Sequence, residues 1–119
     1  MSLVESMAQA IATMEGFYRP NSVSQRQNNP GNLRSWGRHP IVGGYVAFPT
    51  PKVGWSALKV QIEKNIQRGL TMDEFFAGKA GVYAGYAPGA DQNDPKGYAA
   101  FVAKQCKVPA LDVPLSRFL

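Results

Sequence analysis

The sequence predicts a mainly α domain of the α+β kind, in which one small β-hairpin follows the first helix. Three observations predict this class. Apolar residues recur every three or four positions in several segments, and residues that typically begin a helix stand before these segments. Residues 19–50 instead contain many turn residues, with a Gly-Gly pair between two short apolar runs. A chain of 119 residues can bury its own core, so we expect a single domain over residues 1–119.

The first helix is expected to run from about residue 3 to residue 17. Ser2 and Glu5 have the spacing of a capping box, in which each side chain accepts a free backbone N–H group near the helix start. Gly16 and Pro20 indicate the end of the helix, since glycine is common just after the last turn and proline cannot continue it. The predicted apolar face consists of Leu3, Met7, Ala10, Ile11, Met14, Phe17 and Tyr18.

Residues 19–50 are expected to form loops that carry short strands. Gly43-Gly44 separates Ile41-Val42 from Tyr45-Val46-Ala47-Phe48, and glycine tolerates the positive φ angles of a two-residue hairpin turn. Residues 33–36 are a candidate third strand. We therefore predict one hairpin, inserted between the first helix and the next.

The next helix is expected to begin at Thr50-Pro51 and to end near Gly69. It is the candidate central helix of the fold. Thr71 and Glu74 form a second capping box before a short helix whose two phenylalanines, Phe75 and Phe76, point to the core.

Residues 83–93 are expected to form a short helix or turn followed by a loop. Asp94-Pro95 is typical of a helix start and opens the last clear helix. Its buried stripe is predicted to contain Tyr98, Phe101, Val102 and Cys106. The tail, residues 108–119, is expected to pack over the outside of the domain.

Composition narrows the classes of function. Thirteen basic and eight acidic side chains give a formal charge of +5, which suits an anionic partner, but the basic residues are scattered and do not predict a nucleic-acid groove. Cys106 is the only cysteine and is expected to be a small buried hydrophobe. His39 is the only histidine, which leaves a metal site or a Ser-His triad without support. We expect no cofactor, no metal and no membrane span, and a monomer.

Glu15 is the first candidate for chemistry. It follows Ile11 by four residues and precedes Tyr18 by three, so its carboxyl group should lie at the border of the apolar face of the first helix. A carboxyl group on a rigid helix end is well held for donating a proton. An ordinary glutamate at the flank of a helix is the alternative.

The stretch Asn28-Asn29-Pro30-Gly31-Asn32-Leu33-Arg34 is the most unusual of the chain. Asparagine before proline suits a tight turn, so the stretch can be purely structural. Its three amides and one guanidinium also supply donors and acceptors for the acetamido and hydroxyl groups of sugars. We expect Asn32 and Arg34 to point toward a cleft, where Arg34 would hold a carboxylate, either of a bound peptide or of Glu15 itself.

An ordered set of motifs resembles the lysozyme-like superfamily, in particular a phage-associated subgroup that degrades peptidoglycan and contains lytic transglycosylases and muramidases. The set covers residues 7–103. It consists of Met14-Glu15-Gly16-Phe17, Asn28-Asn29-Pro30-Gly31-Asn32-Leu33-Arg34, Ala47-Phe48 with Gly54-Trp55, and Tyr86-Ala87-Pro88 through Asp91-Gln92-Asn93-Asp94 to Tyr98.

The resemblance implies a lysozyme-like helical domain that cuts the β-1,4 bond between the two amino sugars of peptidoglycan, with Glu15 as the catalytic acid. It also implies a tyrosine near the acid, for which Tyr83 and Tyr86 are the nearest matches. Together with the amide-rich loop, the expected substrate-binding residues are Asn29, Asn32, Arg34, Tyr83, Tyr86 and Asp91.

The reaction depends on whether a second carboxylate takes part, as in most glycosidases. No aspartate or glutamate occurs between Glu15 and Glu63, so the hairpin region contains none. Either Glu15 serves as acid and then base while a sugar hydroxyl closes an anhydro ring, as in lytic transglycosylases, or Asp91 or Asp94 places a water molecule for hydrolysis. The alternative is a purely structural role for these aspartates, with Asp94 as a helix cap and Asp91 as a turn residue. The sequence favours the single-acid reaction.

The expected partner is therefore the peptidoglycan strand, and nucleic acid is not expected. A non-catalytic wall-binding or virion structural module is the alternative in another class of protein. The first residues lack the basic flank of a secretory signal, so we expect action on the bacterial cell wall from a virion or as a released phage endolysin.

Overall fold

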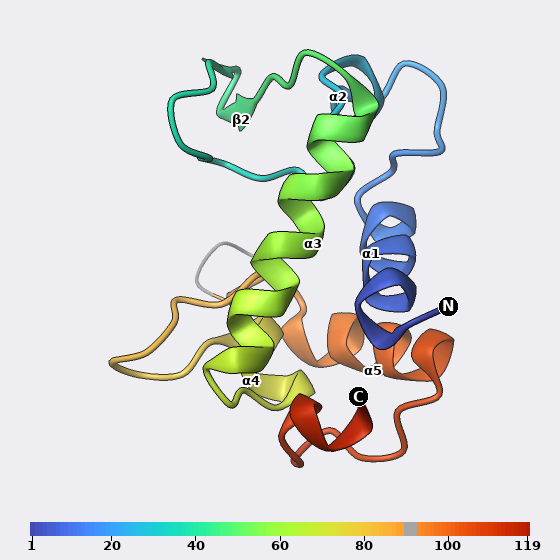
Figure 1. Cartoon of the computed structure of the whole chain (residues 1–119), viewed down its shortest axis with the longest axis vertical. Helices are drawn as coiled ribbons and strands as arrows, with labels where there is room; N and C mark the ends of the chain where they lie inside the picture. The colour runs from blue at the N-terminus through green and yellow to red at the C-terminus, as the bar shows by residue number, and fades with distance from the viewer. Residues whose placement is uncertain (90–92) are drawn as a thin grey trace. The chain divides into compact units, whose positions relative to one another are not determined.

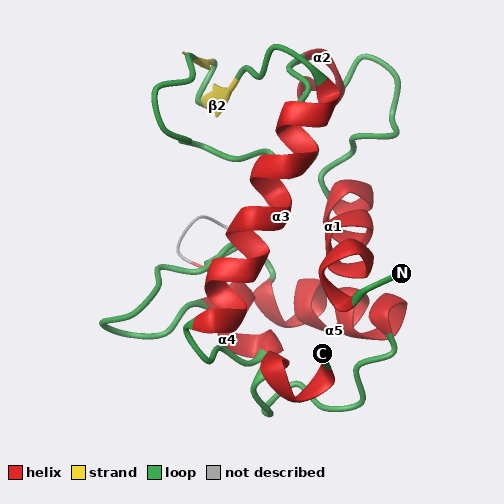
Figure 2. Cartoon of the chain, viewed as in Figure 1, coloured by secondary structure: helices red, strands yellow, loops and turns green. Residues whose placement is uncertain are grey.

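The computed structural model describes residues 1–89 and 93–119, and within these residues helices dominate and the strands form one antiparallel hairpin (Figure 1, Figure 2). The mainly α class with one small hairpin is confirmed, but a short helix at Val23–Arg26, which was not predicted, lies between the first long helix and the hairpin. The elements are α1 (Leu3–Met14), α2 (Val23–Arg26), β1 (Ile41–Val42), β2 (Tyr45–Val46), α3 (Pro51–Gln67), α4 (Met72–Ala77), α5 (Pro95–Cys106) and the 3₁₀-helix η2 (Leu115–Phe118).

The chain divides into two compact units. Residues 8–62 form the first, which we call the Glu15 unit, and residues 1–7 with 63–119 form the second, which we call the aromatic unit. Both boundaries fall within helices, in α1 and in α3. The single domain expected over residues 1–119 stays a prediction, and each unit is described by itself below.

Helix α1 begins as predicted and ends three residues earlier than predicted. Ser2 and Glu5 form the expected capping box, with reciprocal hydrogen bonds of 3.1 Å. At the other end, Gly16 N–H donates to Thr13 O (3.2 Å) and Phe17 N–H donates to Ala12 O (3.0 Å). This pair of bonds is a Schellman motif, and it requires the positive φ angle (81°) that Gly16 adopts. The motif stops the helix at Met14 and leaves Glu15 as its C-cap residue.

The early end of α1 changes which of its predicted apolar residues are buried. Met7, Ala10 and Ile11 are buried, whereas Met14 and Tyr18 are exposed. The predicted face is therefore confirmed for Met7, Ala10 and Ile11 and wrong for Met14 and Tyr18. Phe17 is half-buried and packs against Trp55, with 5.3 Å between the ring centroids.

The hairpin pairs Ile41 with Val46 and Val42 with Tyr45 around the Gly43-Gly44 turn, as predicted. Val46 is fully buried, whereas Ile41 and Val42 are more than half exposed. The third strand predicted at residues 33–36 is wrong, since these residues lie outside any strand. Leu33 contributes one carbonyl group, which accepts the Val46 N–H at 2.9 Å, and the turn that follows at residues 37–38 ends the pairing there.

Helix α3 begins as expected with Pro51 in its first turn, where Thr50 Oγ1 accepts the N–H of Val53 at 3.2 Å. Ile11, Leu58 and Ile62 are fully buried in the core of the Glu15 unit. Gly54 of α3 faces the backbone of Asn28, and a Cβ atom at this position would overlap the Asn28 carbonyl oxygen. The amide-rich loop thus lies directly on the first turns of α3, near α2 (Figure 1).

The aromatic unit has a core of stacked rings. The predicted capping box of Thr71 and Glu74 is present at the start of α4. Phe75 and Phe76 are fully buried, as predicted, and the Phe76 ring stacks on Tyr98 of α5 with 4.4 Å between the ring centroids. Stacked aromatic pairs stabilise a core by about 0.5–1.5 kcal/mol in addition to the stabilisation from burying their apolar surface. Ring packing thereby joins α4 to α5.

The last helix and the tail differ in detail from the prediction. Tyr98 and Val102 are buried on α5, but Phe101 and Cys106 are only half-buried. Burial still raises the pKa of the Cys106 thiol to about 11, which keeps it protonated at neutral pH. In the tail, Leu115 of η2 is fully buried and donates its N–H to Leu70 O at 2.9 Å, so this part of the tail closes the core rather than covering its outside.

Candidate functional site

Glu15 is held at the end of α1 by a side chain of the amide-rich loop. Its backbone N–H still donates to Ile11 O at 2.8 Å, which places its Cα at a fixed point of the last helical turn. The amide nitrogen of Asn32 donates to the Glu15 carboxylate oxygen Oε1 at 3.0 Å and to the Glu15 backbone oxygen at 3.2 Å. Both the backbone and the half-buried carboxylate of Glu15 are therefore positioned by one residue.

The loop that carries Asn32 is tied to β2 by its other amides. Asn28 Nδ2 donates to Phe48 O at 3.1 Å, and Gln27 Nε2 donates to Tyr45 O at 3.2 Å. Asn29 Nδ2 donates to Val46 O at 3.0 Å and to Leu33 O at 2.9 Å. The acceptors of these hydrogen bonds are backbone carbonyl groups. The side-chain amides thus take the place that backbone N–H groups have in a sheet.

Asn29 has a structural role, and the expectation that it contacts the substrate is not compatible with its position. The residue has no exposed surface. Besides the two bonds of its amide nitrogen, its side-chain oxygen accepts the Leu33 N–H at 2.9 Å, and its backbone oxygen accepts the Ser24 hydroxyl at 2.7 Å. Both donors of the amide are used inside the protein, which is how a buried asparagine avoids a large desolvation penalty.

Asn32 differs from Asn29 in how well it is satisfied. Its backbone lies in the left-handed region (φ 49°), and its buried side-chain oxygen has no hydrogen-bond partner among the residues that the structure describes. An unpaired buried acceptor costs about 1–3 kcal/mol. Asn32 is thus a poor choice for stability alone, and what it contributes is the pair of bonds to Glu15.

Glu15 and Asn32 lie in the wall of a surface cavity of about 410 Å³. Arg19 also lines it, as does Tyr45 of β2, so the wall combines the end of α1, the chain that follows it and the hairpin. Most of the lining side chains are polar. The full set is Glu15, Arg19, Pro20, Asn21, Ser22, Val23, Ser24, Asn32 and Tyr45.

Arg34 lies beside this cavity rather than in its wall. Its guanidinium carbon is 5.5 Å from the centre of the Tyr45 ring, within the range of a cation–π contact. Arg34 is not among the residues that line the cavity, but it contacts Tyr45, which does line it. Whether Arg34 holds a carboxylate stays a prediction.

The Glu15 unit contains many more basic than acidic side chains. Among residues 8–62, Glu15 is the only carboxylate, against six lysine and arginine side chains. The aromatic unit contains seven acidic and seven basic side chains. The whole formal charge of +5 therefore belongs to the unit that contains the cavity, and a catalytic mechanism confined to this unit has one carboxylate to use.

No family model, curated protein or solved structure matches this chain.

Tyr83 and Tyr86, the expected tyrosines of the site, belong to the aromatic unit. Tyr86 stacks on Phe75 with 5.6 Å between the ring centroids and donates its backbone N–H to Phe75 O at 2.8 Å. The guanidinium carbon of Arg68 lies 5.4 Å from the centre of the Tyr83 ring. Both rings take part in packing within their own unit, and a role for either beside Glu15 stays a prediction.

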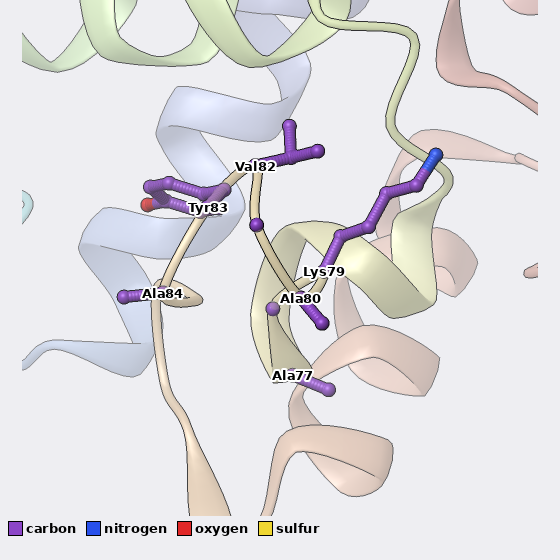
Figure 3. Close-up of a pocket in the computed structure, with 8 residues that line it drawn as sticks. Ala77, Lys79, Ala80, Val82, Tyr83 and Ala84 are labelled. Atoms are coloured by element: carbon purple, nitrogen blue, oxygen red, sulfur yellow. The ribbon is translucent and has the colours of Figure 1, made fainter.

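Tyr83 also lines a larger cavity, of about 550 Å³, formed by residues 77–84 (Figure 3). In Figure 3 the Tyr83 ring and the Lys79 side chain extend to different sides of the loop, so their polar ends do not converge. Lys79 is instead 3.8 Å from the Glu74 carboxylate. We regard the smaller cavity as the better candidate because charged and amide groups meet there.

Asp91 and Asp94 are the two candidates for a second carboxylate, and the structure describes only Asp94. Asp91 lies outside the described residues. Asp94 caps α5, where its side chain accepts the Gly97 N–H at 3.1 Å, in agreement with its reading as a helix cap. Within the part of the chain that the structure describes, no three His, Cys, Asp or Glu side chains are grouped to hold a metal ion, and no helix has the length and apolarity to cross a membrane.

Arg19 and Tyr45 line the cavity but are not among the site residues predicted from the sequence. Arg19 follows Glu15 by four residues and stands next to the tight turn at Pro20, which was a usable signal for a cation near the carboxylate. Tyr45 was assigned to the hairpin, but the face of the strand that borders the cavity depends on the register with β1. That register is set by the turn and by burial of Val46.

Proposed function

We propose that this chain is a peptidoglycan-degrading glycosidase in which Glu15 is the general acid. The observation that carries the proposal is the position of its carboxylate, held by Asn32 at 3.0 Å in the wall of a polar cavity of about 410 Å³. A proton donor must be kept within reach of the leaving oxygen in a fixed direction. The helix end and the Asn32 amide together supply such a support.

The character of the cavity supports a sugar as the ligand. Its wall offers hydroxyl, amide and guanidinium groups, which can bind the hydroxyl and acetamido groups of an amino sugar, and it also contains one aromatic ring, that of Tyr45. A ring at the edge of a polar cavity suits the apolar face of a sugar ring. An anionic wall polymer also agrees with the positive charge of the Glu15 unit.

The solitary carboxylate of this unit favours a lytic transglycosylase over a hydrolase. In such a reaction Glu15 protonates the glycosidic oxygen, and the bond from that oxygen to the anomeric carbon breaks. The 6-hydroxyl of the same muramic acid then bonds to the anomeric carbon while its proton passes to the Glu15 carboxylate. The proton is returned, no water is consumed, and the products are a free 4-hydroxyl and a 1,6-anhydro end.

Mass spectrometry of the fragments released from purified peptidoglycan tests the proposal. We expect fragments with anhydro ends, each lighter by one water than its hydrolysed counterpart. Fragments with reducing ends would support the hydrolytic muramidase instead and would direct the search for a second carboxylate to Asp91 and Asp94. Release no greater than from peptidoglycan without the protein would contradict both.

A further inference from the structure

We propose that Arg19 binds a carboxylate of the substrate in the cavity that contains Glu15, so that the preferred substrate is an anionic glycan rather than a neutral one. This inference rests on the proposed function, because it concerns the substrate of the same cavity. Arg19 belongs to none of the motifs that resemble lysozyme-like proteins, and it takes no part in the proposed proton transfer.

Arg19 is held against the helix end that carries the acid. Its backbone N–H donates to Gly16 O at 3.0 Å. Its guanidinium group lies over Gly16, where even a single added Cβ atom would overlap the terminal nitrogen Nη2. Gly16 therefore meets two needs, the positive φ angle of the helix end and free space for Arg19, and the guanidinium lies against the residue that follows Glu15 in the chain.

The guanidinium group of Arg19 makes no hydrogen bond or ion pair with any described residue. A guanidinium offers five N–H donors in a planar fork that matches the two oxygens of a carboxylate. Two other polar side chains of this wall are already engaged, Asn32 with Glu15 and the Ser22 hydroxyl with Gly16 O at 2.6 Å. Arg19 is thus a cationic donor of the cavity that remains free for a ligand.

A cation is also what an anionic substrate would need at this place. A substrate carboxylate brought into the cavity would be repelled by the ionised form of Glu15, and Arg19 offsets this repulsion. The other five basic side chains of residues 8–62 add a long-range attraction for an anionic polymer. A neutral glycan of the same linkage would gain from neither effect.

A peptidoglycan strand offers a carboxylate from two sources. Where the peptide has been removed, each muramic acid exposes the carboxylate of its lactyl group. Where the peptide is present, that group is part of an amide bond, and the carboxylates lie on the amino acids of the peptide. The shared chemistry is a carboxylate beside the cleaved sugar, and the two kinds of strand distinguish the sources.

The test compares Arg19→Gln, Arg19→Lys and Arg38→Gln for binding to soluble glycan strands, all in a Glu15→Gln background so that no strand is cut. Arg38 is an exposed arginine of the same unit outside the cavity wall, so Arg38→Gln removes the same charge elsewhere. The probes are peptide-bearing strands, peptide-free strands, and both after conversion of their carboxylates to amides.

We expect Arg19→Gln to weaken binding about tenfold to at least one of the two unmodified strands, as for loss of a charge-assisted hydrogen bond. Arg19→Lys should restore part of it, and Arg38→Gln should have little effect. Loss only with peptide-free strands identifies the lactyl carboxylate as the source, and loss only with peptide-bearing strands identifies the peptide. On amidated strands the variants should bind alike.

Three results would overturn the inference. Equal loss on unmodified and amidated strands would mean that Arg19 supports the fold of the cavity, and equal loss for Arg19→Gln and Arg38→Gln would mean a general effect of charge. No loss on either unmodified strand would mean that the carboxylate is bound elsewhere or not at all. Because these measurements need no turnover, a failure of the glycosidase proposal appears separately, as a lack of released fragments from the wild-type protein.

Discussion

The two units differ in what they bury and in the charge that they carry. The aromatic unit packs Phe75 and Phe76 against one another and against Tyr98, and its acidic and basic side chains balance. The Glu15 unit buries two polar residues, Ser24 and Asn29, and carries the whole net charge of the chain. The aromatic unit has packed rings in its core, and the Glu15 unit uses buried hydrogen bonds to hold an irregular loop.

The difference indicates where function is concentrated. A loop fixed by hydrogen bonds from its side-chain amides to backbone carbonyl groups can hold a side chain such as Asn32 in a fixed direction. The side-chain oxygen of Asn32, which has no partner among residues 1–89 and 93–119, is a local cost of that arrangement. Costs of this kind are typical of binding and catalytic sites, and the described residues that meet around Glu15 fit that description.

The largest expected effect is on the rate of fragment release, when a carboxylate is removed from one unit or from the other. Glu15→Gln should lower the release of peptidoglycan fragments by about a thousandfold, within the range for loss of a general acid. Glu63→Gln, which changes an exposed carboxylate of the aromatic unit, should leave the rate unchanged. Fragment release is measured by chromatography at matched protein concentration. Equal small release by wild type and Glu15→Gln would instead favour a wall-binding or virion structural module without turnover.

The second effect compares the buried asparagines, one from each unit. Asn29 makes three side-chain hydrogen bonds, whereas Asn65 makes one, from Arg68 at 2.6 Å, and leaves its amide nitrogen without a partner among the described residues. Asn29→Ala should lower the free energy of unfolding by about 3 kcal/mol, since it removes three buried hydrogen bonds and leaves the Leu33 N–H without its acceptor. Asn65→Ala should lower it by about 1 kcal/mol. Urea unfolding measures both. Similar losses would contradict the view that the loop depends on its amide bonds.

The third effect tests whether Asn32 acts through Glu15 or through the fold. Asn32→Gly keeps a residue that tolerates the positive φ angle and removes both bonds to Glu15. We expect fragment release to fall about tenfold, as for loss of a charge-assisted bond, while the melting temperature changes little. A large fall in melting temperature with an unchanged rate would show that Asn32 is only structural.

The smallest effect comes from the aromatic unit. Thr71→Ala removes the side chain that accepts the Glu74 N–H at 3.1 Å in the capping box of α4. The free energy of unfolding should fall by about 1 kcal/mol, as for other caps. The rate of fragment release at a temperature well below unfolding should remain that of the wild type. A loss of rate as large as that of Asn32→Gly would mean that the catalytic machinery is not confined to the Glu15 unit.

The sequence by itself determined the elements whose causes are local. Capping boxes at Ser2 and Thr71, the proline in the first turn of α3 and the Gly-Gly hairpin turn involve neighbours within four residues, so their patterns are visible in the chain. Glu15 at a helix end beside a glycine was visible for the same reason. The sequence also determined that residues 8–62 contain no second carboxylate.

Only the tertiary structure decided what the amide-rich loop does with each of its amides. Asn28, Asn29 and Asn32 are chemically identical, yet Asn28 and Asn29 bind carbonyls seventeen to twenty residues away in or next to β2, and Asn32 binds Glu15. Their roles differ because the backbone turns each side chain toward a different neighbour, with Asn28 and Asn32 both at positive φ. A contact across so many residues depends on how the loop packs against α3 and beside the hairpin, which no local pattern encodes.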